Sequence, residues 1–151
     1  MDLKHCIYAR KSSEAEDRQA LSLESQLNAC NEIKDKLKIK VEKVFQESQS
    51  AKTPGRDKFN QMVQEVESGK INSIITWKPD RLSRNPFDSA TVLSLIDNNK
   101  LIQVVTPSQT FTNESMSKMM LGFFMLQAKF ENDCKSDNVK RGLKIKAEKG
   151  W

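Results

Sequence analysis

The chain has 151 residues, of which 30% are charged and 37% hydrophobic, a balance typical of one soluble globular domain and unlike that of a disordered chain. Its three cysteines (Cys6, Cys30 and Cys134) are far apart, which argues against a disulfide framework or a structural zinc site and predicts reduced thiols. No apolar run approaches the roughly 18 residues of a membrane span, and the N-terminus lacks a signal-peptide pattern, so we expect a cytoplasmic protein.

Most of the net charge of +5 lies near the C-terminus. Residues 135–151 contain six lysines or arginines and two acidic residues, so this segment alone carries +4. A basic segment of this kind is typical of a protein that binds nucleic acid. The alternative is a solvated helix end, because lysine and arginine also favour the last turn of a helix.

Short runs rich in β-forming residues predict strands over residues 4–9, 39–45, 71–77 and 101–106, and favour a short fifth strand over 109–112. Three helical stripes of apolar residues separate these strands. The first stripe follows Ser22, a suitable N-cap, and contains Leu23, Leu27, Cys30, Ile33 and Leu37. The second lies between Pro54 and Gly69 and contains Phe59, Met62, Val63 and Val66. The third begins at Pro86 and is expected to face inward through Phe87, Ala90, Leu93 and Ile96.

Strands that alternate with helices predict an α/β fold for residues 1–113, in which a mostly parallel sheet of four to five strands has helices on both faces, in three layers. Ligands of such sheets bind at the carboxyl ends of the strands. Two arginine-containing segments follow predicted strands directly: Arg10-Lys11-Ser12 and Asp80-Arg81-Leu82-Ser83-Arg84. We therefore expect the fold to bring these two segments together.

No proline interrupts residues 115–149, which predicts a helix of about 35 residues within a C-terminal unit spanning 114–151. Its first half is apolar along one face and its second half is basic. One small domain cannot cover so long a helix, so we expect the apolar face to pack on a second subunit, although packing on the sheet would cover part of it. The residues expected at this interface are Met116, Met119, Met120, Phe123, Phe124 and Phe130.

A serine accompanied by several arginines limits the reactions that the predicted site could catalyse. The one histidine, His5, lies inside a predicted strand, and no cluster of carboxylates or histidines suggests a metal site. Phosphoryl transfer needs mainly positioning and positive charge, which arginines supply. Ser12 beside these arginines therefore indicates attack on a phosphodiester. The alternative is a solvated loop whose arginines form surface ion pairs.

Several motifs in order along almost the whole chain resemble the catalytic domain of the serine recombinases, the resolvase/invertase family. They are Tyr8-Ala9-Arg10-Lys11-Ser12-Ser13, Ser22-Leu23-Glu24-Ser25-Gln26, Gly55-Arg56, Asp80-Arg81-Leu82-Ser83-Arg84-Asn85 and Phe130-Glu131. The basic ending resembles the large serine recombinases, or integrases, where their DNA-binding domains begin, so we expect a catalytic domain that continues into such domains. The spacing from Arg10 to Gln26 is longer than in the small resolvases, and their glutamine before the Ser-Leu motif has no clear match.

The resemblance implies that Ser12 is the nucleophile and forms a 5′-phosphoserine link, while Ser13 is its neighbouring rival. It further implies that Arg10, Arg56, Arg81 and Arg84 surround the phosphate, that Asp80 orients arginines or assists proton transfer, and that Gln26 supports them. Neither metal, ATP nor another cofactor is implied. The implied partners are double-stranded DNA and further copies of the chain, as a dimer and a synaptic tetramer. DNA contact is expected at Lys135, Lys140, Arg141, Lys144 and Lys146.

Two other functions remain as alternatives. A flavodoxin-like phosphate-binding module shares the alternating strand and helix pattern, but typically has acidic residues at its strand ends. A non-catalytic DNA-binding or assembly module would keep the long helix without needing Ser12 and four arginines.

Overall fold

The computed structural model describes residues 2–11, 22–47 and 57–126, and these contain one five-stranded sheet in the order β2-β1-β3-β4-β5. The strands are β1 (His5–Arg10), β2 (Val41–Glu47), β3 (Ser73–Thr76), β4 (Gln103–Val105) and β5 (Thr110–Phe111). The first four are parallel, and β5 runs antiparallel to β4. The mostly parallel sheet and its short fifth strand are thus confirmed.

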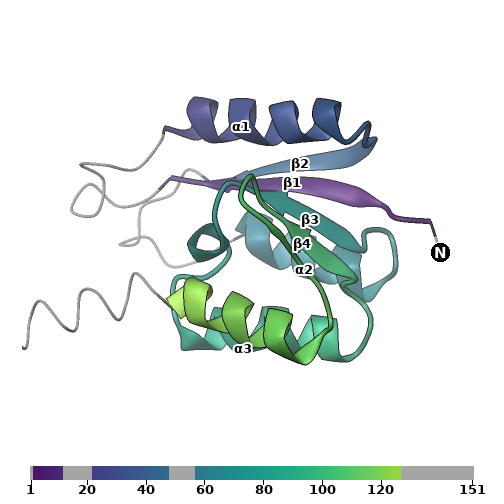
Figure 1. Ribbon diagram of the computed structural model, residues 1–151, viewed down its shortest axis with the longest axis vertical. Coiled ribbons are helices and arrows are strands. Elements are labelled where there is room, and N and C mark those ends of the chain that lie inside the picture. The colour runs from purple at the N-terminus through teal and green to yellow at the C-terminus, as the bar shows by residue number, and fades with distance from the viewer. Residues whose placement is uncertain (1, 12–21, 48–56, 127–151) are drawn as a thin grey trace, which may run out of the picture.

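Helices cover both faces of this sheet. They are α1 (Leu23–Lys36), α2 (Asp57–Glu67), α3 (Pro86–Asp97) and a helical segment over residues 115–126, with a single 3-10 turn, η2 (Pro79–Arg81), after β3. Figure 1 shows α1 on one side of the sheet, and α2, α3 and the 115–126 helix on the other. The predicted three-layer α/β architecture is confirmed, whereas the predicted helix start at Pro54 and the remainder of the 114–151 unit lie outside the described residues.

Strand β1 is the centre of the core, because all six of its residues are buried. Its side chains alternate between the two faces, as the pleat of a strand requires. Cys6 and Tyr8 pack in the larger apolar cluster with α2 and α3, while Ile7 packs beneath α1 with Cys30. Cys6 and Cys30 are free thiols, as predicted, and burial raises the pKa of Cys30 to about 12, so this thiol stays protonated and unreactive.

The ends of the helices follow the predicted local chemistry. Ser22 caps α1, and its hydroxyl accepts a hydrogen bond from the amide of Ser25 at 3.2 Å. Pro86 occupies the first turn of α3 after the cap residue Asn85. Gly69 follows α2 with φ of 84°, a left-handed conformation that costs glycine little.

The predicted inward face of α3 is wrong in its first turn. Phe87 is 79% exposed and Ala90 is also exposed, although Leu93 is half-buried and Ile96 is buried, as expected. Asp88 and Ser89 face inward instead. The reason is that this turn packs against the loop before it, where Asp88 and Ser89 hydrogen-bond to Arg84 and Ser83, so polar contacts rather than apolar spacing set the rotation of the helix.

A search of the described residues for helices long and apolar enough to cross a membrane finds none.

Candidate functional site

The side chain of Arg10 joins the ends of two neighbouring parallel strands. Arg10 is the last residue of β1, and its Nε and Nη2 donate hydrogen bonds to the carbonyl oxygens of Arg81 at 3.1 Å and Asp80 at 3.0 Å. The guanidinium is nearly buried, with 8% of the residue exposed. The structure therefore brings together the end of β1 and the Asp80–Arg84 loop, as the topology predicted. It also shows that two of the Arg10 donors hold the backbone of that loop.

Gln26 fixes the backbone of Arg10 from the opposite side of the sheet. It lies in the first turns of α1, fully buried, and its Nε2 donates to the carbonyl oxygen of Arg10 at 3.0 Å. The amide of Arg10 in turn donates to Oε1 of Gln26 at 3.4 Å. A strand end has backbone groups that the ladder does not pair, and this reciprocal amide contact satisfies one donor and one acceptor. The helix cap at Ser22 sets where α1 begins and hence where Gln26 lies.

The Asp80–Arg84 loop contains buried charged groups that lack hydrogen-bond partners. Arg81 is 8% exposed, and its Nε lies 3.7 Å from Oδ1 of Asp80, an ion-pair distance longer than a hydrogen bond. Neither of these atoms, nor Nε of Arg84, has a hydrogen-bond partner among the described residues. A buried donor without a partner costs about 1–3 kcal/mol. The loop is therefore suited to an anion that supplies acceptors to both arginines.

A polar network at the start of α3 holds Arg84 in place. The amide of Arg84 donates to Oδ2 of Asp88 at 3.0 Å, and the amide of Asp88 donates to Oδ1 of Asn85 at 2.9 Å. The hydroxyls of Ser83 and Ser89 lie 2.6 Å apart. Sequence reasoning missed Asp88 and Ser89, although the Asn-x-x-Asp spacing across a helix start is a capping pattern that could have indicated them.

Glu47, at the end of β2, is a second functional candidate that sequence reasoning missed. It is buried, and its Oε2 accepts hydrogen bonds from the hydroxyl of Tyr8 at 3.3 Å and from the amide of Phe59 at 3.0 Å. Phe59 lies in the first turn of α2, where a carboxylate is favourable to the exposed amides and the helix dipole. The Glu47 carbonyl accepts from the amide of Lys11 at 2.9 Å. Glu47 therefore ties β1 and α2 together beside the arginine site.

Several predicted site residues lie outside the described residues, and the structure does not place them. They are Ser12, Arg56, Phe130, Lys135, Lys140, Arg141, Lys144 and Lys146. Ser12 follows Lys11, the last described residue of its segment, two positions after the end of β1.

The predicted apolar interface of the 115–126 helix divides into two faces. Phe124 is partly buried and makes an edge-to-face ring contact with Phe111 of β5, next to the buried Leu121 and Met125. The other predicted residues are exposed by 36–64% of their surface: Met116, Met119, Met120 and Phe123. Packing on the sheet thus covers one face of the helix, and an apolar face remains on the outside.

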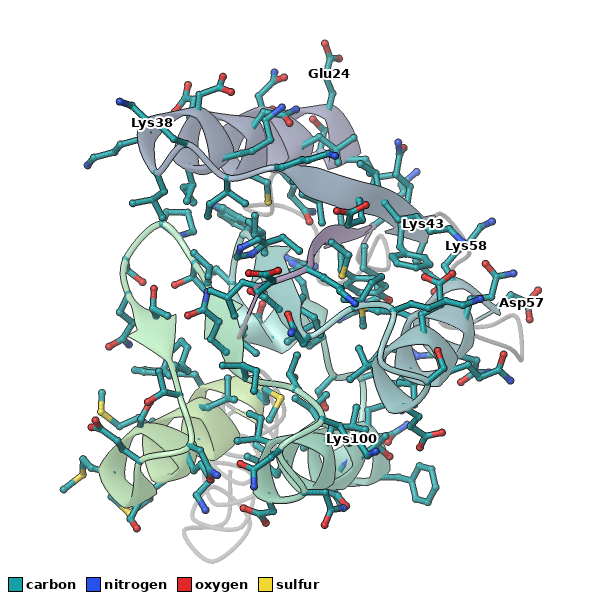
Figure 2. The ribbon with its side chains drawn as sticks, turned by 90° about the vertical axis from the view of Figure 1, so that its right-hand side faces the viewer. Glu24, Lys38, Lys43, Asp57, Lys58 and Lys100 are labelled. Atoms are coloured by element: carbon teal, nitrogen blue, oxygen red, sulfur yellow. The ribbon has the colours of Figure 1, made fainter. Side chains whose placement is uncertain are left out.

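The opposite edge of the sheet has a different character. Figure 2 views the molecule from the side where the parallel strands begin, and Lys38 and Lys100 lie there, in the turns that lead into β2 and β4. Both are exposed. Among the described residues, no group of three or more histidine, cysteine, aspartate or glutamate side chains could hold a metal ion. The two arginines that are buried among the described residues, Arg10 and Arg81, lie at the carboxyl edge.

Residues 5–151 match the family model described as "Resolvase, N terminal domain". No curated protein matches the chain. Among solved structures, the N-terminal catalytic domain of TP901-1 integrase superposes with a TM-score of 0.63 at 18% identity, over 87% of this chain and 98% of that one. A resolvase family site-specific recombinase from Streptococcus pneumoniae gives 0.62 at 19% identity, over 97% and 99%. The C-terminal catalytic domain of ISC1926 TnpA, an IS607-like serine recombinase, gives 0.55 at 18% identity, over 95% and 97%. At such identities the structural likeness establishes a shared fold.

Proposed function

Because the chain belongs to the resolvase N-terminal domain family, we propose that it is the catalytic domain of a serine-type site-specific DNA recombinase. One observation in this structure supports the proposal in addition to family membership. Arg10 links the end of β1, from which the chain continues to Ser12, to the loop that contains Arg81 and Arg84. The strand end that precedes Ser12 in the chain and the arginine loop therefore lie at the same edge of the sheet.

In the proposed reaction the hydroxyl oxygen of Ser12 attacks the phosphorus of a DNA phosphodiester. A serine–phosphate bond forms as the bond from phosphorus to the 3′ oxygen breaks, and that oxygen takes a proton and leaves as a free 3′-hydroxyl. The products are a 5′-phosphoserine link and a cut strand. Attack of a 3′-hydroxyl on this link reverses the step and reseals DNA. One phosphate ester replaces another, so the energy of the phosphodiester bond is kept in the serine link and resealing needs no ATP.

The arginines have two roles in this mechanism. Arg81 and Arg84 stabilise the charge that grows on the phosphate oxygens in the transition state, together with Arg56. Arg10 supports them by holding the loop backbone, and Gln26 supports Arg10. Asp80 lies beside Arg81 and orients its guanidinium or assists proton transfer to the leaving oxygen. Buried arginines at the strand ends favour this function over a flavodoxin-like module, which uses acidic residues there.

We also propose that copies of the chain associate through the exposed apolar face of the 115–126 helix. Met116, Met119 and Phe123 are 64%, 63% and 59% exposed on consecutive turns of that helix. Methionine adapts to different partners, which suits an interface that repacks during strand exchange. The basic residues at 135–149 would then contact DNA phosphates beyond this interface, and such contacts position a protein without specifying sequence.

Covalent capture tests the proposed chemistry directly. The protein is incubated with a random-sequence pool of nicked duplexes in the presence of a chelator, denatured, and analysed for DNA that stays attached. A nick lets the cut fragment diffuse away, so the link accumulates. We expect attachment to the 5′ phosphate, with the linked peptide containing Ser12, and complete loss in Ser12→Ala but not in the matched control Ser13→Ala.

Other outcomes would identify other chemistry. A link through Tyr8 would indicate a tyrosine mechanism. Chelator-sensitive cutting without any covalent species would indicate a metal-dependent nuclease. Unchanged capture by Ser12→Ala would refute the assignment of the nucleophile.

A further inference from the structure

The indole ring of Trp77 lies at the entrance to the arginine loop. Trp77 is the first residue after β3 and comes two positions before η2, and its side chain is half-buried. The guanidinium carbon of Arg81 lies 5.5 Å from the centre of the indole ring, within the range of a cation–π contact. The ammonium of Lys78 lies 4.6 Å from the same ring. Two cations therefore meet one aromatic surface beside the site.

The backbone of Arg81 is held by hydrogen bonds, while its side-chain Nε is unpaired among the described residues. Its backbone is fixed, because its amide donates to the carbonyl of Lys78 at 3.0 Å and its carbonyl accepts from Arg10. Its side-chain Nε has no hydrogen-bond partner among the described residues, and Asp80 lies at 3.7 Å. An arginine held by carboxylates would use its in-plane N–H groups on them. An aromatic ring contacts the face of the guanidinium, so the N–H groups in the plane remain available.

We propose that Trp77 is a positioning residue, in addition to Asp80, that orients the Arg81 guanidinium for the phosphate. The inference rests on the proposed function for its consequence, but the contact itself follows from the geometry alone. Trp77 fixes the plane of the guanidinium, and this determines the direction of the paired donors that match phosphate oxygens. Leucine is apolar but has no aromatic ring, so it occupies part of the same space without attracting the cation. A phenyl ring retains the aromatic face.

Fluorescence tests the contact independently of any reaction. The chain has two tryptophans, Trp77 and Trp151, so Trp151→Phe leaves Trp77 as the sole source of indole emission. In that background we expect Arg81→Ala to increase quenching of Trp77 by acrylamide, because one face of the ring loses its cover. Unchanged quenching would mean that Arg81 does not stack on the ring, and would overturn the proposal.

Kinetics tests whether the orientation of Arg81 by Trp77 affects DNA cleavage. The substrate is a duplex recovered by the covalent capture described above. Under saturating DNA, Trp77→Leu is expected to lower the single-turnover cleavage rate about tenfold, equal to about 1.4 kcal/mol, with DNA affinity and thermal midpoint near those of the wild type. Trp77→Phe should restore most of the rate. Phe87→Leu is the matched control, because Phe87 is an exposed aromatic residue on α3 with 79% exposure.

Each remaining outcome decides the question. A wild-type rate in Trp77→Leu, or a loss that Trp77→Phe does not rescue, refutes the positioning role. If Lys78→Met lowers the cleavage rate as much as Trp77→Leu does, the ring acts through Lys78 and not through Arg81, and the positioning role is also refuted. If the wild type captures no duplex, the proposed function fails, and the quenching measurement alone decides whether Trp77 holds Arg81.

Discussion

Replacing Gln26 by leucine tests whether the contact between α1 and the end of β1 holds the site together. The side chain is fully buried and exchanges two hydrogen bonds with the Arg10 backbone, at 3.0 and 3.4 Å. Leucine leaves one buried carbonyl and one buried amide without this partner, at about 1–3 kcal/mol each, with the longer bond at the low end. The added apolar burial offsets about 1 kcal/mol. We therefore expect a loss of about 1–3 kcal/mol in the free energy of unfolding.

Urea denaturation followed by circular dichroism measures this loss. With a slope of about 2 kcal/mol per molar urea, the midpoint should fall by roughly 0.5–1.5 M. Asn28→Leu is the matched control, because it makes the same kind of change on the exposed side of α1 and should stay within about 0.5 kcal/mol. Gln26→Glu should destabilise at least as much as leucine at neutral pH, since a carboxylate would face the Arg10 carbonyl. A midpoint for Gln26→Leu equal to that of the wild type would show that these hydrogen bonds do not stabilise the fold.

Three further predictions concern separate parts of the chain. Burial lowers the pKa of His5 below its ordinary 6.5, so on acidification the unfolded chain takes up this proton before the folded protein does. The free energy of unfolding, measured between about pH 7.5 and pH 5, should therefore decrease at pH values below 6.5, and it should decrease less steeply in His5→Leu. Equal slopes in the two proteins would contradict this prediction. Phe123→Lys should shift the protein towards monomer in sedimentation velocity at tens of micromolar, whereas Phe87→Lys should not; a self-associating Phe123→Lys would exclude this face. Asp88→Ala should lower the free energy of unfolding by about 1–3 kcal/mol in thermal or urea unfolding, because the Arg84 amide loses its acceptor. Asp88→Asn keeps an acceptor oxygen and should retain most of the stability. If both variants lose the same amount, the charge of Asp88 and not its hydrogen bond stabilises the fold.

The sequence predicts the scaffold well because its signals are local. Ser22 is a good cap at the start of an amphipathic stripe, and Gly69 suits the left-handed turn after α2, so neighbouring residues alone indicate both boundaries. The meeting of two strand ends follows from the parallel direction of the strands, whose carboxyl ends lie at one edge of the sheet. These rules do not depend on which side chains later pack together.

The details of the site depend on contacts between distant residues, which local patterns do not contain. Glu47 has the sequence context of an exposed strand end, and only the approach of α2 and β1 makes it a buried acceptor for Phe59 and Tyr8. The spacing of Phe87 predicts a core residue, but the polar partners of Asp88 set the rotation of α3. The resemblance implies that Arg10 contacts the phosphate, and no local pattern indicates that two of its donors also bind carbonyls some 70 residues later in the chain.

The antiparallel direction of β5 determines the direction in which the 115–126 helix runs. Strand β4 runs towards the carboxyl edge, and β5 returns the chain to the opposite edge before the 115–126 helix begins. The helix therefore travels back and ends on the side where β1 and η2 also end, as Figure 1 shows. Had the chain entered that helix directly from β4, its last turn would point away from the arginines. A two-residue strand thus reverses the direction of the chain, and the 115–126 helix ends on the same side of the molecule as β1 and η2.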